Sequence, residues 1–252
     1  MRPIEEQGYV VIAQDTETVS YVAMARRLAG SLRQWHPHAR LCLLTDHAVD
    51  APEFDHVRFL TDPDPRAWHN DWQVWRHSPF RETIKLEADM LIASPIDHWW
   101  TMLRCRDLVI STGCRNWKDE ISTIDHYRSV FRDNHLPDVY NAITYWRVSE
   151  TARDFFAWVR RIFQHWTQYR RLLKFSPDQP DTDLVYAMAA QILGPELVTV
   201  PGSPTIVHMK RHHAGTAKEP WHHELVWETD PLRIQTLPQW GAFHYHVKDW
   251  RP

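Results

Sequence analysis

Three segments near the start of the chain alternate between strand-like and helical patterns, and this alternation constrains the fold more than any other feature. Residues 9–13 (YVVIA) are a continuous apolar, β-branched run, which is typical of a buried strand. From residue 20 to Trp35, apolar side chains recur every three or four positions, which predicts an amphipathic helix. Residues 41–44 (LCLL) form a second apolar run. Since strand, helix and strand imply a right-handed crossover between parallel strands, we expect an α/β fold.

Later segments continue this alternation without a linker or an internal repeat. The patterns predict further strands at 57–60, 82–86, 90–92, 107–111 and 139–148, and helices at 67–77, at 97–103, after Ser149 and at 184–193. Short strands are expected near the end of the chain, at 197–200, 205–209, 225–227, 232–235 and 242–246. We therefore expect one domain over residues 1–252, with a mostly parallel sheet, flanking helices and an irregular C-terminal extension.

A low glycine count limits how the chain could bind phosphate groups. The 252 residues include only 7 glycines, and neither G-x-G-x-x-G nor a P-loop motif is present. The net charge of −3 argues against a protein that grips nucleic acid by charge alone, although a nucleic acid could still be a substrate. If a nucleoside diphosphate is bound, a metal ion is the obvious substitute for a glycine cradle.

The compartment is predicted from three simple features. The first 15 residues lack the pattern of a signal peptide, and no apolar run approaches the ~20 residues that span a bilayer. The 3 cysteines do not make a disulfide framework. We therefore expect a cytoplasmic protein.

Two acidic residues follow an apolar run in the segment 85–91 (KLEADML). In an extended chain, residues two apart point to the same side, so Glu87 and Asp89 can face one cation. In open α/β sheets, ligands gather at the carboxyl ends of strands. Carboxylates are the ligands that hard divalent cations such as Mg²⁺ prefer. The sequence therefore predicts a metal site here. The alternative is that the two acids are simply solvated, because acid-x-Asp triplets are common in proteins.

The order of strand, helix and strand, followed by IKLEADMLIASPIDHWW at 84–100, resembles the GT-A fold glycosyltransferases. The similarity is strongest to family-8 enzymes such as glycogenin and bacterial galactosyltransferases. It implies a Rossmann-like nucleotide-diphospho-sugar transferase fold in which Glu87 and Asp89 hold Mn²⁺ or Mg²⁺ against the donor pyrophosphate. It also implies a donor pocket for the nucleoside, lined by Ala13, Gln14, Asp15 and Tyr21.

Weaker matches extend the resemblance into the second half of the chain. The segment 138–142 (DVYNA) is similar to a family segment whose asparagine faces the donor sugar, which implies this role for Asn141. The segment 181–186 (DTDLVY) lies where the family has an acid beside the reacting sugar. Asp183 is the preferred match for this acid, and Asp181 is the rival.

The family ends with a histidine that completes the metal site and a lysine that contacts phosphate. The segment 246–250 (HVKDW) is a compressed version of this ending, without its glycine and proline, and implies His246 as a metal ligand and Lys248 as a donor contact. His208 heads a competing match. His244 shares a strand face with His246, so three histidines remain candidates for the third ligand.

The resemblance implies a metal-dependent glycosyltransferase that moves a hexosyl or pentosyl group from a nucleotide sugar, with UDP expected as the nucleotide, to an acceptor hydroxyl with retention of configuration. Residues 1–111 would bind the nucleotide and metal, and residues 112–252 would face the acceptor. Two alternatives are a sugar-nucleotide nucleotidyltransferase and a degenerate GT-A domain that binds without catalysis. The first usually needs a glycine-rich first turn, which DTET at 15–18 does not offer.

The acceptor is left open by these motifs. The helix after Ser149 carries a basic face, formed by Arg153, Arg160, Arg161, Arg170 and Arg171. Such a face is most often simply solvated, but contact with a phosphate backbone is an alternative. A phage-type enzyme that glycosylates a modified DNA base is therefore one hypothesis for the acceptor.

Overall fold

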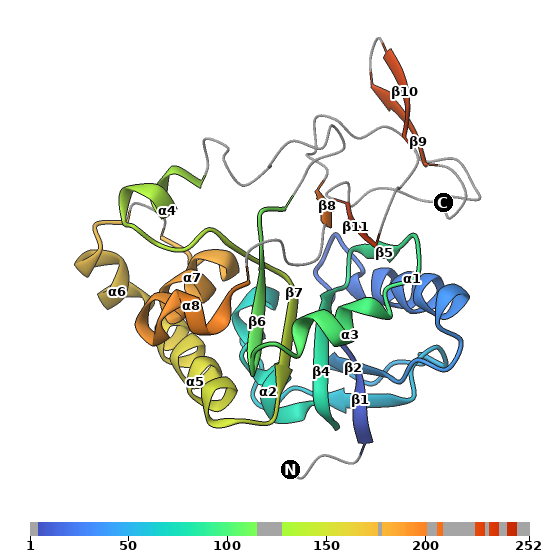
Figure 1. The fold of residues 1–252 in the computed structure, drawn as a ribbon, viewed down its shortest axis with the longest axis horizontal. Coiled ribbons are helices and arrows are strands. Elements are labelled where there is room, and N and C mark those ends of the chain that lie inside the picture. The colour runs from blue at the N-terminus through green and yellow to red at the C-terminus, as the bar shows by residue number, and fades with distance from the viewer. Residues whose placement is uncertain are drawn as a thin grey trace.

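The computed structural model describes residues 5–114, 128–175, 178–200, 206–208, 225–229, 232–236 and 241–245. Its centre is a six-stranded sheet in the order β3-β2-β1-β4-β7-β6 (Figure 1). The strands are β1 (Glu5–Ile12), β2 (Leu41–Thr45), β3 (His56–Phe59), β4 (Phe80–Glu87), β6 (Leu108–Thr112) and β7 (Val139–Arg147). Neighbours from β3 to β4 are parallel, whereas β7 runs antiparallel to β4 and β6. The predicted mostly parallel α/β sheet is confirmed.

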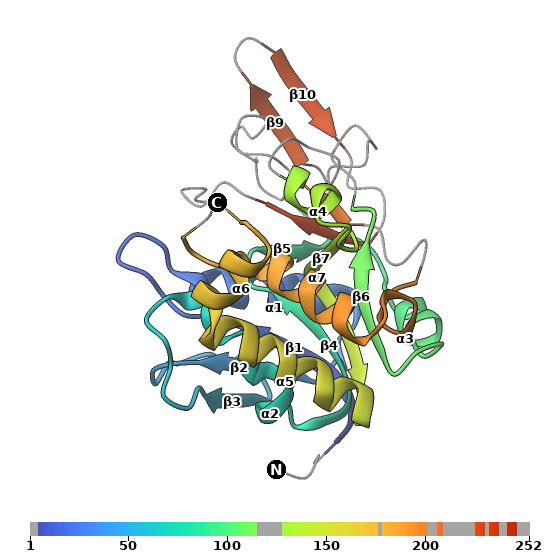
Figure 2. The same ribbon diagram turned by 90° about the vertical axis from the view of Figure 1, so that its left-hand side faces the viewer.

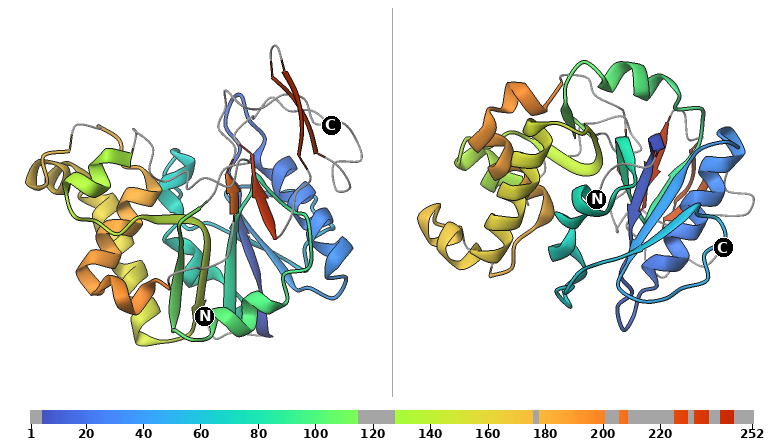
Figure 3. Two further views of the ribbon diagram at one scale, coloured as in Figure 1. Left: turned by 45° about the horizontal axis from the view of Figure 1, so that its top comes forward. Right: turned by 90° about the horizontal axis from the view of Figure 1, so that it is seen from below.

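Helices cover both faces of this sheet. The long ones are α1 (Tyr21–Trp35), α5 (Glu150–Gln164) and α7 (Thr182–Leu193), and the short ones are η1 (Ala67–Asn70), α2 (Gln73–His77), α3 (His98–Leu103), α4 (Ser129–Asp133), α6 (Trp166–Leu172) and α8 (Pro195–Val198). Alternate residues of β1 belong to the two apolar cores: Tyr9 and Val11 pack on the side of α1 and α3, and Val10 packs on the side of α5 and α7. Figure 3 shows α1 on one side of the sheet and α5 and α7 on the other.

Three predictions need correction. The single helix expected at 67–77 is divided into the 3-10 helix η1 and the short helix α2. The long helix expected after Ser149 is broken at His165, where α5 ends and α6 begins, although Ser149 does cap α5 by accepting a hydrogen bond from the Ala152 N–H. The strand expected at 197–200 is wrong, because residues 195–198 form α8. Pro195 at the first helical position favours this helix, since its fixed φ and missing N–H suit a helix start.

Two small sheets lie beyond the carboxyl end of β4 (Figures 1 and 2). The first has the order β5-β11-β8, where β5 is Met90–Ile92, β8 is Ile206–His208 and β11 is Ala242–His244. The second is the hairpin of β9 (Leu225–Thr229) and β10 (Leu232–Thr236). Because β5 follows β4 after a two-residue turn, its pairing with β11 brings a late part of the chain to the end of β4. Among the described helices, none has the length and apolarity needed to cross a membrane.

Gly8 in β1 gives a test of the packing against Phe80 of the neighbouring strand β4. A Cβ added at Gly8 would lie 2.4 Å from the ring of Phe80, whereas one added at Gly30 in α1 would meet nothing within 4 Å. Gly8→Ala should therefore lower the free energy of unfolding by about 1–3 kcal/mol through overpacking. Gly30→Ala should raise it by about 0.5–1 kcal/mol, because alanine favours helix. Urea denaturation measures both, and a Gly8→Ala variant as stable as the wild type would contradict this packing.

Glu5 at the start of β1 predicts a pH-dependent part of the stability. Its carboxylate accepts a hydrogen bond from Arg40 Nε at 2.6 Å and lies 2.6 Å from His56 Nε2. Arg40 is the main reason that the pKa of Glu5 falls from 4.5 to about 2, and His56 adds to the effect against the opposing cost of burial. A depressed pKa gives stability above the unfolded value that is lost as the pH falls through the folded value.

Glu5→Gln should therefore lower the free energy of unfolding at pH 7, and its difference from the wild type should shrink as the pH falls from about 4.5 to about 2. The matched control is Glu6→Gln, because Glu6 is exposed and lies 3.8 Å from Arg81. Chemical denaturation across this pH range measures both variants. A constant difference for Glu5→Gln would show that the ion pair does not carry the effect.

Candidate metal and donor site

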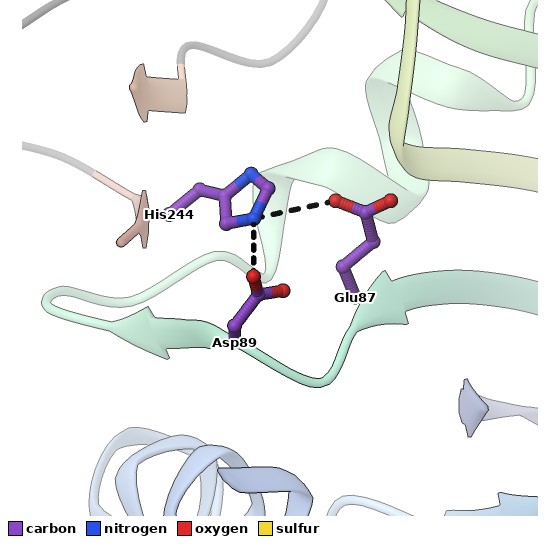
Figure 4. A group of neighbouring side chains, drawn as sticks. All are labelled: Glu87, Asp89 and His244. Atoms are coloured by element: carbon purple, nitrogen blue, oxygen red, sulfur yellow. Dashed lines mark ion pairs between the residues drawn. The ribbon is translucent and has the colours of Figure 1, made fainter. Parts of the chain in front are cut away.

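Glu87 is the last residue of β4, and Asp89 lies in the two-residue turn into β5. Glu87 pairs in register with Ile12, the last residue of β1. The two acids face the same space (Figure 4), but the turn at 88–89 brings them together instead of the extended chain that the sequence argument assumed. Asp89 is buried and Glu87 is half-buried. Burying a carboxylate is costly without a partner, so Asp89 is not simply a solvated surface acid.

A histidine joins this acid pair from a distant part of the sequence. His244 ends β11 and pairs with Met90 of β5. Its Nε2 atom lies 3.0 Å from Asp89 Oδ2 and 3.4 Å from Glu87 Oε2 (Figure 4). One ligand atom from each of the three residues lies within 4.8 Å of the others. Two carboxylates and one imidazole form a donor set that suits Mn²⁺ better than Mg²⁺, because imidazole is a softer ligand than oxygen.

The other candidates for the third ligand have different positions. The backbone of His208 pairs with His244 in the parallel pair β8–β11. His246 and Lys248 lie outside the described residues, so their expected roles stay predictions. His244 was one of the three histidines left open by the sequence, and it is the one that the structure brings beside Glu87 and Asp89.

Tyr140 of β7 orients the His244 ring. Its hydroxyl lies 2.5 Å from Nδ1 of His244, on the opposite side of the ring from the two acids. Burial lowers the pKa of His244, and the negative charge of Glu87 opposes this shift. The lowered pKa favours the neutral imidazole, which is the form that binds a metal. The contact of Tyr140 with Nδ1 leaves Nε2 directed at the carboxylates. Tyr140 was not predicted from the sequence, because nothing in a strand pattern reveals a contact with a residue so far along the chain.

Asn141 and Asp183 meet beside this group. The Asn141 N–H donates to Asp183 Oδ1 at 2.8 Å. The Asn141 side chain is 2% exposed, and its Nδ2 atom has no hydrogen-bond partner among the described residues. A buried amide donor without a partner is costly, which is consistent with a missing ligand. The structure thus brings together the asparagine and the acid that the sequence matched to the reacting sugar.

The two acids at the start of α7 have different surroundings. Asp181 is the N-cap of α7 and accepts a hydrogen bond from the Leu184 N–H at 3.2 Å. Burial raises the pKa of Asp183, and the nearby Arg128 opposes the shift. The charge of Glu87 contributes to the same increase, which places Asp183 within electrostatic reach of the acid pair.

Arg128 holds Asp183 from the other side and was not predicted from the sequence. Its guanidinium is buried and donates to Asp183 Oδ2 at 2.8 Å and to Asp138 Oδ1 at 3.0 Å. It also stacks over the ring of Phe131 at 4.0 Å. Arg128 fixes the Asp183 carboxylate while Asn141 binds its other oxygen. No sequence signal marked Arg128, because it lies in the segment 113–138, whose pattern is irregular.

The four residues expected to line the donor pocket follow β1 at the same edge of the sheet, and they are Ala13, Gln14, Asp15 and Tyr21. Tyr21 is half-buried, and its pKa is raised by burial and by the charge of Glu87. The phenol therefore lies near the acid pair. Ala13 is buried, and its N–H donates to the Leu44 carbonyl at 2.9 Å.

Two of these donor-pocket candidates already have protein partners. The Gln14 amide is buried, donates to Asp46 Oδ2 at 3.1 Å and accepts from Asn70 Nδ2 at 2.7 Å. Asp15 accepts a hydrogen bond from the Val22 N–H at 2.9 Å, in the first turn of α1. Both side chains therefore hold the loop after β1 in its conformation, whether or not they also contact a nucleotide.

A buried ion pair lies beneath the site. Lys85 of β4, two residues before Glu87, is fully buried and its Nζ atom lies 2.7 Å from Asp71 Oδ1. The Tyr186 hydroxyl of α7 also donates to Asp71. In addition, Lys85 donates to the Asn141 carbonyl at 3.4 Å. The pair therefore links β4, β7 and α7 directly below the candidate ligands.

Comparison with solved structures identifies the fold. The chain is similar to the galactosyltransferase LgtC in complex with donor and acceptor sugar analogs, with a TM-score of 0.55 and 14% identity over 94% of this chain and 86% of that one. It is also similar to mouse xyloside xylosyltransferase 1 in its apo form, with a TM-score of 0.50 and 12% identity over 83% of this chain and 89% of that one. No family model and no curated protein sequence matches. The GT-A fold expected from the sequence is thus confirmed.

The buried pair of Lys85 and Asp71 predicts that a single substitution has a large effect on the free energy of unfolding. Asp71→Asn would leave the Lys85 ammonium buried without a counter-charge, so the free energy of unfolding should fall by about 3–5 kcal/mol. The control is Asp133→Asn, because the pair of Asp133 and Arg132 is exposed and should contribute less than about 1 kcal/mol. Urea denaturation of both variants measures the difference. Equal small effects would mean that Lys85 is not held by Asp71.

Proposed function

We propose that this protein is a metal-dependent glycosyltransferase that moves a sugar from a nucleoside-diphosphate sugar, with UDP as the nucleotide, to an acceptor hydroxyl. One observation carries the proposal: Glu87, Asp89 and His244 converge at the carboxyl edge of a GT-A sheet. In α/β sheets this edge is the usual place for ligands. The similar structures, a galactosyltransferase and a xylosyltransferase, support sugar transfer and leave both hexosyl and pentosyl donors open.

The donor set fits Mn²⁺, which when bound would supply Lewis-acid stabilisation of the leaving diphosphate. Glu87 and Asp89 hold their carboxylates toward that position, and His244 directs Nε2 there because Tyr140 fixes its ring. Lys248 would add positive charge to the same phosphates, by resemblance to the family.

The sugar would lie beside Asn141 and Asp183. The unpartnered Nδ2 donor of Asn141 is suited to a sugar hydroxyl, because a hydrogen bond there would satisfy a buried group. The Asp183 carboxylate, held by Arg128 and the Asn141 N–H, would stabilise positive charge that develops on the sugar ring. Transfer with retention of configuration follows from the resemblance to family 8.

Two measurements test the metal and the reaction together. In calorimetry, UDP should bind wild-type protein more tightly with Mn²⁺ than without it, since both contact the same site. With each common nucleotide sugar and Mn²⁺, mass spectrometry should detect donor hydrolysis or transfer. Asp89→Ala should lower this turnover by at least about a hundredfold, because the leaving diphosphate loses its charge stabilisation.

The control for Asp89→Ala is Asp50→Ala, which removes an exposed acid outside the site and should leave turnover unchanged. Unchanged turnover in Asp89→Ala would refute the assignment of the metal site. If UDP and Mn²⁺ bind without enhancing each other and no donor turns over, the domain is a binding module instead of an enzyme.

A further inference from the structure

A concave site lies between α2 and α5, apart from the candidate metal site. It is a groove of about 660 Å³, which we call the α2–α5 groove. Its lining includes Trp72, Trp75 and Trp146 together with four arginines, namely Arg76, Arg153, Arg160 and Arg161. This volume is in the range of sites that bind small molecules or one unit of a polymer. The proposed sugar transfer does not use this groove.

The charged side chains that line the groove are all positive. No aspartate or glutamate is among its lining residues, although it contains four arginines. Arg153 is paired with Asp154 at 2.9 Å, just outside the lining. Arg76, Arg160 and Arg161 have no acidic partner among the described residues, and all three are exposed. Clustered cations without counter-charges attract an anionic ligand, even though the whole chain has a net charge of −3.

The groove also has an aromatic side. The Arg160 guanidinium lies over the Trp72 ring at 4.6 Å. Trp75 is half-buried and stacks on Phe156, with ring centroids 6.1 Å apart and an angle of 13° between the planes. Flat aromatic surfaces combined with arginines are the features by which proteins bind unpaired nucleic-acid bases and their phosphates. A duplex would offer only its phosphates to such a concave aromatic surface.

The arginines are too widely spaced for one phosphate. From Arg153 to Arg161 the helix α5 rises by about 12 Å. A ligand with several successive phosphates is therefore a better fit than a mononucleotide. We propose that the α2–α5 groove binds single-stranded nucleic acid, with phosphates on the arginines of α5 and a base against the tryptophan side.

The groove lies far from the candidate metal site. Phe80, which begins β4, lines the groove, whereas Glu87 ends the same strand at the metal site. Seven residues of extended strand span about 23 Å. In Figure 1, α2 and α5 lie toward the bottom of the molecule, and β5 and β11 lie toward the top. A nucleic-acid strand bound in the groove would therefore not place the bound nucleotides at the metal site. Binding in the groove does not depend on the proposed sugar transfer.

The test uses fluorescence anisotropy with a fluorescein-labelled 12-nucleotide oligothymidine, in EDTA and without a nucleotide sugar. Wild-type protein should bind the oligonucleotide at 50 mM salt, and affinity should fall steeply at 200 mM as counterions are released. Arg160→Glu/Arg161→Glu should weaken binding at least tenfold and reduce the salt slope by about 0.7 for each phosphate that is no longer neutralised. The matched control is Arg132→Glu/Arg171→Glu, which makes the same charge change at exposed arginines outside the groove.

The control should stay within about twofold of wild type, and circular dichroism should show that both double variants are folded. The proposal is overturned if the wild type does not bind, or if both double variants lose affinity equally. It is also overturned if thymidine monophosphate competes as well as the oligonucleotide at equal nucleotide concentration, or if vesicles containing phosphatidylserine compete as effectively. Asp89→Ala should keep oligonucleotide affinity while losing donor turnover, so this result and the failure of the proposed function are distinguishable.

Discussion

The pairing of β11 with β5 is the interaction on which the candidate site depends. The turn between β4 and β5 presents Glu87 and Asp89 together, but two carboxylates alone leave a cation open to water on most sides. The His244–Met90 register adds an imidazole from the last part of the chain. Tyr140 then fixes that ring from β7. Three separate segments therefore meet where the parallel strands end, and each contributes at least one polar group.

Sequence patterns predicted what is local and could not predict what depends on distant pairing. The central strands and α1 follow from apolar periodicity, and the candidacy of Glu87 and Asp89 follows from their position directly after an apolar strand. The third ligand could not be chosen from the sequence, because three histidines fit the expected strands and only the pairing of β11 with β5 places His244 beside the acids. Arg128 was missed for a similar reason, since its buried partners come from β7 and α7.

Buried charges surround the site in matched pairs. Lys85 is held by Asp71, and Arg128 is held by Asp183 and Asp138. Such pairs contribute little net stability, because desolvation of both partners offsets their attraction. They do fix the positions of their side chains, because moving a buried charge away from its partner would cost free energy. The Asn141 backbone, which contacts both Lys85 and Asp183, is thereby held between two of these pairs.

The ligands Asp89 and His244 come from parts of the chain separated by α5, α7 and the second half of the sheet. An ion bound by both would act as a reversible cross-link that closes a very long loop. Closing such a loop removes conformational freedom from the unfolded chain and ties the last strand to the core. If an ion binds there, mass action would couple the docking of β11 to the concentration of free metal.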